Sequence, residues 1–142
     1  MSILYNTALD EKGIGGKLRL YFSQVICVIN GDDIYFIEGF INGKFEKYTN
    51  NMLYVNEKIP IMTAFSHFCY QNTNNLIMVS DLQGCNTLLT DPVIHSVRQM
   101  YYEQGDCGQE GMMGFFASHK CNEYCKALGL KNIQYKENQR IT

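Results

Sequence analysis

Apolar residues in the first third of the chain follow a pattern typical of β-strands. Residues 18–29 are rich in Leu, Val, Ile and Tyr, and the same pattern resumes over residues 33–37. The intervening Asn-Gly-Asp at 30–32 predicts a β-hairpin, because Asn and Gly tolerate positive φ angles. A shorter segment at 44–48 follows a glycine-containing break, and the polar residues 49–51 are predicted to form a loop.

Helical spacing replaces this pattern farther along the chain. Pro60 suits the first turn of a helix, where its missing N–H is not needed. The apolar residues that follow it at helical spacing are Ile61, Ala64, Phe65 and Phe68. A second helical set comprises Met112, Phe115, Phe116 and His119. Between the two helices, residues 76–79 form a short apolar run that predicts a buried strand ending at Ser80-Asp81. Sheet and helix segments without a βαβ rhythm predict an α+β fold.

The length of 142 residues is that of one ordinary domain. Residues 1–17 are predicted to be a polar lead-in and residues 132–142 a polar tail. The lead-in ends in a glycine run and Lys17, but a phosphate-binding loop would have Ser or Thr after the lysine. Leu18 follows instead. A flexible lead-in is therefore favoured over a nucleotide loop.

Composition excludes several classes of protein. Hydrophobic residues make up 46% of the chain and charged residues 18%, which is typical of a globular domain. A net charge of −2 provides no field that would attract nucleic acid or an anionic membrane. We find neither a secretory signal nor an apolar run near the roughly 20 residues of a membrane helix. The sequence thus predicts a cytoplasmic protein whose six cysteines are thiols or metal ligands.

Soft metal ligands gather near the end of the chain. Cys121 and Cys125 are four residues apart and point the same way if Asn122 caps a short helix. His119 is only two residues from Cys121, so the preceding helix must end near Lys120 for the three to converge. This set predicts a zinc site that needs one more ligand.

Two other histidines could complete that site. His67 lies on the first predicted helix, beside its apolar stripe, and His95 follows the second aspartate of the segment 81–91. The position of His67 on a core helix favours it over His95. A hydrogen-bonded core histidine is the alternative interpretation of His67, and spacing alone favours this alternative.

Hard oxygen ligands form a second cluster. Asp81 and Gln83 project to the same side if the chain is extended, and Asp91 returns after a turn that ends at Pro92. Such a trio at the end of a strand can hold Mg²⁺ bridged to nucleotide phosphates. A capped turn with solvated aspartates explains the same spacing, and it is the simpler explanation of these residues alone.

Glycines recur with a period of three residues at Gly105, Gly108 and Gly111. Their backbone N–H groups could contact a phosphate, or their small size could let a peptide approach closely. A plain loop before a helix is an equally good interpretation.

In order along the chain, these motifs resemble the alpha-type protein kinases, an atypical Ser/Thr kinase family with a zinc-anchored C-terminal lobe. The motifs are Gly43-x-Phe45-x-Lys47-Tyr48-x-Asn50-Asn51, Ala64-Phe65-Ser66-His67-Phe68, Asp81-Leu82-Gln83-Gly84, Leu89-Thr90-Asp91-Pro92, Gly105-x-x-Gly108-x-x-Gly111 and His119-x-Cys121-Asn122-x-x-Cys125. The likeness covers about residues 18–131, which we take as a partial alpha-type kinase domain.

The resemblance implies a role for each candidate residue. The four zinc ligands would be His67, His119, Cys121 and Cys125, and the zinc would be structural. Asp81 would be the catalytic aspartate, Gln83 and Asp91 the magnesium ligands, and Glu38 the hinge glutamate that contacts the adenine. The glycines at 105, 108 and 111 would form the loop that helps to bind the peptide substrate.

The implied activity is transfer of a phosphoryl group from Mg-ATP to Ser or Thr hydroxyls of a protein substrate. Domains of this family begin with a β-rich lobe whose lysine contacts the phosphates, and most of that N-terminal lobe is expected to be absent here. Lys17 precedes the hairpin and does not match that lysine. The alternative is therefore a catalytically silent, zinc-stabilised pseudokinase that binds protein partners.

Overall fold

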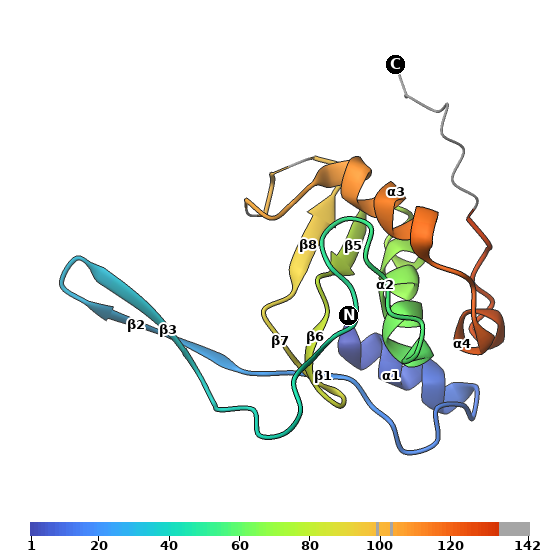
Figure 1. The fold of residues 1–142 in the computed structure, drawn as a ribbon, viewed down its shortest axis with the longest axis horizontal. Coiled ribbons are helices and arrows are strands. Elements are labelled where there is room, and N and C mark those ends of the chain that lie inside the picture. Colours follow the sequence, from blue (N-terminus) through green and yellow to red (C-terminus); the bar gives the residue numbers. More distant parts are fainter. Residues whose placement is uncertain (99, 103, 134–142) are drawn as a thin grey trace.

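The structure is a computed structural model that describes residues 1–98, 100–102 and 104–133 (Figure 1). Its helices are α1 (Ser2–Glu11), α2 (Pro60–Asn72), α3 (Gly108–Ser118) and α4 (Glu123–Ala127). Its strands are β1 (Tyr21–Phe22), β2 (Val25–Asn30), β3 (Asp33–Glu38), β4 (Glu46–Lys47), β5 (Ile77–Ser80), β6 (Gln83–Cys85), β7 (Leu88–Thr90) and β8 (Val93–Ser96). The fold is mixed α+β, as the sequence pattern predicts.

The strands form three small sheets. One sheet has the order β1-β7-β6-β4, β2 pairs with β3, and β5 pairs antiparallel with β8. The single strand expected over 18–29 is divided, because β1 runs parallel to β7 whereas β2 pairs with β3 in a separate sheet. The break between them is anchored by the Ser23 N–H, which donates to the Leu89 carbonyl at 2.7 Å.

Helix α2 occupies the centre of the molecule and begins with Pro60 at its first turn, as predicted. All residues from Ile61 to Cys69 are buried, so the helix is enclosed on every side. It packs against β5, α4 and α1, and Figure 1 shows it between the α1 and α3 layers. This burial places His67 in the interior of the fold.

The predicted polar lead-in is, over residues 2–11, a helix that contributes to the core. Tyr5 and Leu9 have no exposed surface. The Asn6 side chain exchanges two hydrogen bonds, of 2.8 and 2.9 Å, with the backbone of Leu20. The prediction of a flexible segment was wrong here because two apolar positions are a weak helical signal. Tertiary packing stabilises this helix, and local propensity contributes little.

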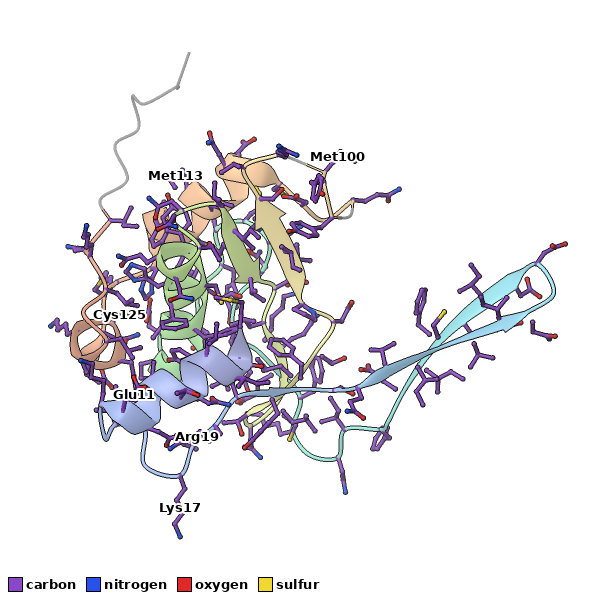
Figure 2. All side chains as sticks on the ribbon, turned by 180° about the vertical axis from the view of Figure 1, so that it is seen from behind. Glu11, Lys17, Arg19, Met100, Met113 and Cys125 are labelled. Atoms are coloured by element: carbon purple, nitrogen blue, oxygen red, sulfur yellow. The ribbon has the colours of Figure 1, made fainter. Side chains whose placement is uncertain are left out.

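The predicted β-hairpin is present, and it projects away from the rest of the molecule (Figure 1). Val25 pairs with Glu38 at its base, and the turn contains Gly31 at a φ of 63°. Every residue of β2 and β3 is exposed, and Phe36 reaches 73%. Apolar side chains leave both faces of this ribbon (Figure 2).

Within the residues that the structure describes, no helix has the length and apolar character needed to cross a membrane. The tail predicted at 132–142 lies outside the described residues from 134 onward.

Candidate functional site

Two histidines and two cysteines converge between α2, α3 and α4. One potential ligand atom from each of His67, His119, Cys121 and Cys125 lies within 4.8 Å of all the others. The Cys121 Sγ is 3.7 Å from His67 Nδ1, and the Cys125 Sγ is 3.5 Å from His119 Nε2. Figure 2 labels Cys125 on α4. The structure thus brings His67 to the other three residues.

Local backbone structure explains this convergence. Helix α3 ends at Ser118, and His119 adopts an extended conformation that turns the chain back toward α2. Asn122 then caps α4, because its side-chain oxygen accepts from the N–H groups of Tyr124 at 3.0 Å and Cys125 at 3.2 Å. The helix end expected near Lys120 and the cap expected at Asn122 are both observed.

The outer nitrogens of both imidazoles have hydrogen-bond partners. His67 Nε2 lies 3.1 Å from the Lys131 carbonyl oxygen, and His119 Nδ1 lies 2.9 Å from the Glu57 carboxylate. Both partners are acceptors, so the outer nitrogens carry the protons. The inner nitrogens, His67 Nδ1 and His119 Nε2, therefore direct lone pairs toward the thiols. Metal-binding histidines have this arrangement.

Burial shapes the ionisation of the four residues. Desolvation and the neighbouring His119 lower the pKa of His67 to about 4, so its imidazole is neutral at pH 7. Desolvation raises the pKa of Cys125 to about 12, so a cation is needed to favour its thiolate. Two thiolates and two imidazoles suit tetrahedral zinc. The residues present fit a zinc ion, and the group could hold one.

His95 lies elsewhere. It is fully buried on β8, and its Nδ1 accepts from the Cys107 N–H at 3.1 Å. This histidine packs between β8 and the start of α3, away from the thiols of Cys121 and Cys125.

The predicted oxygen ligands lie on adjoining strand ends. Asp81 follows β5 and Asp91 follows β7, and both have the left-handed backbone that aspartate tolerates, with φ of 52° and 45°. Gln83 pairs with Thr90 across β6 and β7, and its side-chain amide donates to the Asp91 carbonyl at 3.3 Å. Antiparallel pairing of β6 and β7 therefore brings Gln83 beside Asp91.

A lysine that sequence reasoning left without a role lies at the same place. Lys47 pairs with Gln83 across β4 and β6, and its Nζ is 2.7 Å from Asp81 Oδ1. The signal was present as the Lys-Tyr of the motif at 43–51, but spacing alone does not reveal its partner. Lys17, by contrast, is exposed in the loop after α1 and points away from the fold (Figure 2).

Glu38 joins the hairpin to this cluster. It is the last residue of β3, and the hydroxyl of Thr90 donates to its two carboxylate oxygens at 2.7 and 2.6 Å. Thr90 directly precedes Asp91, so Glu38 lies close to the oxygen ligands.

Backbone conformation or close packing favours glycine at each of the three periodic positions. Gly108, the first residue of α3, has a φ of 61°. A Cβ on Gly111 would lie 2.7 Å from His95 Nε2, and one on Gly105 would lie 3.0 Å from Val93 Cγ2. These contacts are too close for alanine without movement of the neighbours.

Asp106 is a buried anion that sequence reasoning missed. Its carboxylate accepts from the N–H and hydroxyl of Ser96, at 2.9 and 2.7 Å, and from the Gly108 N–H at 2.9 Å. Burial alone would raise the pKa of Asp106, but these hydrogen bonds lower it overall. The residue thereby fastens the start of α3 to β8.

Comparison with known proteins gives consistent relatives. The alpha-kinase family matches residues 4–125. Eukaryotic elongation factor 2 kinase of Caenorhabditis elegans is 39% identical over 115 residues, which are 77% of this chain and 15% of the relative. Alpha-protein kinase vwkA of Dictyostelium discoideum is 43% identical over 100 residues, or 66% of this chain and 16% of that protein. The chain therefore spans about one sixth of the length of these relatives.

Solved structures agree with the sequence relatives. The alpha-kinase domain of myosin heavy chain kinase A in complex with ADP superposes with a TM-score of 0.79 at 29% identity. The match covers 89% of this chain and 54% of that one. The complex of the same domain with AMP-PNP gives a TM-score of 0.78, covering 91% and 52%. By sequence and by fold, this chain belongs to the alpha-kinase family.

Proposed function

We propose that this chain carries the C-terminal catalytic part of a Ser/Thr protein kinase that transfers the γ-phosphoryl group of Mg-ATP to protein hydroxyls. The observation that carries the proposal is the convergence of Lys47, Asp81, Gln83 and Asp91 on adjoining strand ends. Phosphoryl transfer needs such a set: an orienting carboxylate, oxygen ligands for magnesium and a cation near the transferred group. Relatives whose names describe protein kinases support the same reaction.

Each residue has a distinct role in this proposal. Asp81 orients the acceptor hydroxyl and accepts its proton, and Gln83 and Asp91 would hold Mg²⁺ through their oxygen atoms. Lys47, which lies 2.7 Å from Asp81, faces the transferred phosphoryl group and offsets its charge. The magnesium ion, when bound, neutralises charge on the β- and γ-phosphates.

Nucleotide and peptide are assigned to two different segments of the chain. Glu38, held by Thr90 at the base of the hairpin, contacts the adenine. The segment containing Gly105, Gly108 and Gly111 binds the peptide that carries the Ser or Thr. Strand β8 follows Asp91 and leads toward this glycine segment, so the segment comes soon after the cluster in the sequence.

We assign a structural zinc ion to His67, His119, Cys121 and Cys125. The support is their ligand chemistry, their mutual distances within 4.8 Å, and the acceptors on both outer imidazole nitrogens. Such an ion would tie α2 to the segment after α3.

The exposed β2–β3 hairpin is relevant to whether this chain can catalyse phosphoryl transfer without a further protein segment. Solved alpha-kinase domains are about twice as long as the part matched here, with coverage of 51–56% among those compared. We infer that ATP binding also uses a further β-rich segment, which would cover the apolar faces of β2 and β3. The exposure of both strands supports a second candidate function, a zinc-stabilised module that binds protein partners without catalysis.

Radiolabelled ATP, Mg²⁺ and a basic Ser/Thr peptide test the proposal on the full chain. We expect Asp81→Ala to abolish transfer, and Lys47→Met to lower it by about 10²–10³-fold, while both variants keep the zinc content of the parent. Asp32→Ala, at the exposed hairpin turn, and Lys44→Met, a neighbouring exposed lysine, are the matched controls. Transfer at the parent rate in Asp81→Ala would contradict the assignment.

The same assay separates the two candidate functions. Turnover that depends on Asp81 supports the kinase. Stoichiometric zinc without turnover supports the silent module, particularly if turnover is also absent after a lysine-bearing β-lobe of a relative is fused upstream of Met1.

A further inference from the structure

Glu57 makes three hydrogen bonds at the edge of the candidate zinc site, although it is not one of the four ligands. Its Oε1 atom lies 2.9 Å from His119 Nδ1 and accepts from the Lys120 N–H at 3.0 Å. Its Oε2 atom accepts from the Thr63 hydroxyl at 3.1 Å. The side chain is 34% exposed, so it borders the site at the surface of the fold.

These contacts determine the orientation of His119. An ionised carboxylate can only accept hydrogen bonds, so Nδ1 is the nitrogen of His119 that donates to Glu57. The Nε2 lone pair is then available toward Cys125, whose Sγ is 3.5 Å away. The same carboxylate holds the backbone of Lys120 and so limits rotation of the segment that carries the histidine.

Glu57 also belongs to a network that reaches α4. Thr63, which donates to Glu57, accepts from the Asn122 amide at 3.1 Å. The same amide donates to the Pro60 carbonyl at 2.9 Å. The segment that carries three of the four ligands is thereby docked on the first turn of α2.

In the other direction, Glu57 ends a loop that begins beside Lys47. The Asn56 N–H donates to the Tyr48 carbonyl at 2.7 Å, and Thr49 forms a bridge with Val55. Residues 48–56 therefore form a closed loop. One end of this loop follows Lys47, and the other leads into Glu57 at the candidate zinc site.

We propose that Glu57 is the positioning residue of the metal centre: it fixes His119 with Nε2 toward the zinc ion, and it joins the centre to the loop that begins beside Lys47. The proposal rests on the zinc ligation assigned above and is independent of phosphoryl transfer. Glu57 itself does not contact the metal. Acceptors bound to the far nitrogen of a ligating histidine typically change metal affinity by about 10- to 100-fold when removed.

Competition with a chromophoric chelator tests this on the full chain. We expect Glu57→Ala, which loses all three hydrogen bonds, to bind Zn²⁺ about 10- to 100-fold more weakly than the parent. Glu57→Gln keeps the size and one acceptor oxygen, so its loss should be smaller. Asp32→Asn, at the exposed turn of the projecting hairpin, removes the same charge away from the site and should match the parent.

Cobalt substitution and amide exchange separate orientation from general destabilisation. The visible absorption of bound Co²⁺ should change in Glu57→Ala, because His119 loses the acceptor that fixes its orientation and its nitrogen can bind the metal at a different angle. Hydrogen exchange should accelerate at the Lys120 N–H, which donates to Glu57, and remain slow at the Cys125 N–H, which Asn122 caps.

Two results would overturn the proposal. One is a Glu57→Ala chain whose zinc affinity and Co²⁺ spectrum equal those of the parent. The other is equal acceleration of exchange at Lys120 and Cys125, which would indicate loss of the whole fold. A parent that binds no zinc would refute the ligand assignment itself, and because it is measured first, the two failures are distinguishable.

Discussion

At Gly111, the absence of a side chain allows His95 to lie directly against helix α3. An added Cβ would approach His95 Nε2 to 2.7 Å and the Cβ of Cys107 to 2.9 Å. His95 in turn accepts from the Cys107 N–H, so the glycine, the histidine and the start of α3 form one packed unit. A packing role is thus sufficient to explain this glycine, whether or not its segment also binds a peptide.

We expect Gly111→Ala to lower the free energy of unfolding by about 1–3 kcal/mol, because the new methyl group overpacks against the imidazole. In a His95→Ala background the ring is gone and the contact with Cys107 remains, so the same substitution should cost less. Urea denaturation of the four chains measures this coupling. Gly39→Ala is the control, since a Cβ at Gly39 meets no atom within 4 Å. Equal costs in both backgrounds would contradict the contact.

At the scale of elements, α4 is a helix of five residues and cannot be stable by itself. Its first turn depends on the Asn122 side chain, which caps the helix with its oxygen and binds Pro60 and Thr63 through its amide nitrogen. Because Cys125 lies on this helix, the cap also sets the position of a candidate metal ligand.

Asn122→Ala should therefore weaken both folding and metal binding. We expect a loss of about 1–2 kcal/mol in the free energy of unfolding from the cap alone, together with weaker zinc binding. Asn122→Asp keeps the capping oxygen and loses the amide donor, so it should recover the larger part of the capping energy. Chelator competition and denaturation of the two variants test this. Parent-like zinc affinity in Asn122→Ala would show that α4 forms without its cap.

The β2–β3 hairpin is the element with the least tertiary support. Every one of its residues is exposed, and an isolated two-stranded ribbon is marginally stable in water. Its apolar residues on both faces are typical of a ribbon with a layer on each side.

Amide hydrogen exchange should distinguish the hairpin from the interior strands. We expect the amides of β2 and β3 to exchange much faster than those of β5 and β8, since local opening of the hairpin breaks few buried contacts. The comparison is internal to one sample. Equal protection of the two pairs would mean that another layer of protein covers the hairpin in solution.

At the scale of the whole molecule, the candidate zinc site borders both hydrophobic core clusters. One core cluster surrounds α1, α2 and α4, and a second lies between β5 and α3. The four ligands come from α2, the end of α3, the linker after it, and α4. A metal at this place would add a further connection between both clusters.

Zinc removal should accordingly affect the entire fold. We expect a strong chelator to abolish cooperative thermal unfolding followed by circular dichroism, and added zinc to restore it. Cys121→Ser should behave like the chelated chain, whereas Cys27→Ser, in the exposed hairpin, should melt like the parent. Finding that the chelated chain melts as sharply as the parent would contradict a structural metal.

Local signals account for the parts of the fold that were predicted correctly. The hairpin turn, the proline that starts α2, the cap at Asn122 and the approximate end of α3 each depend on neighbours within a few residues. Helix α1 was missed because its two core residues, Tyr5 and Leu9, are buried by packing against α2, and the local sequence does not show this contact.

For the candidate sites too, some features could be read from the local sequence and others only from the structure. The sequence by itself determined the chemistry, with soft ligands near the end of the chain and hard ones after β5, because residue type and short spacing are local properties. Only the tertiary structure decided the partners: His67 joins Cys121 across 54 positions, Glu57 joins His119 across 62, and Lys47 meets Asp81 through strand pairing. The physical reason is that such contacts follow from packing of distant segments, which no local pattern encodes.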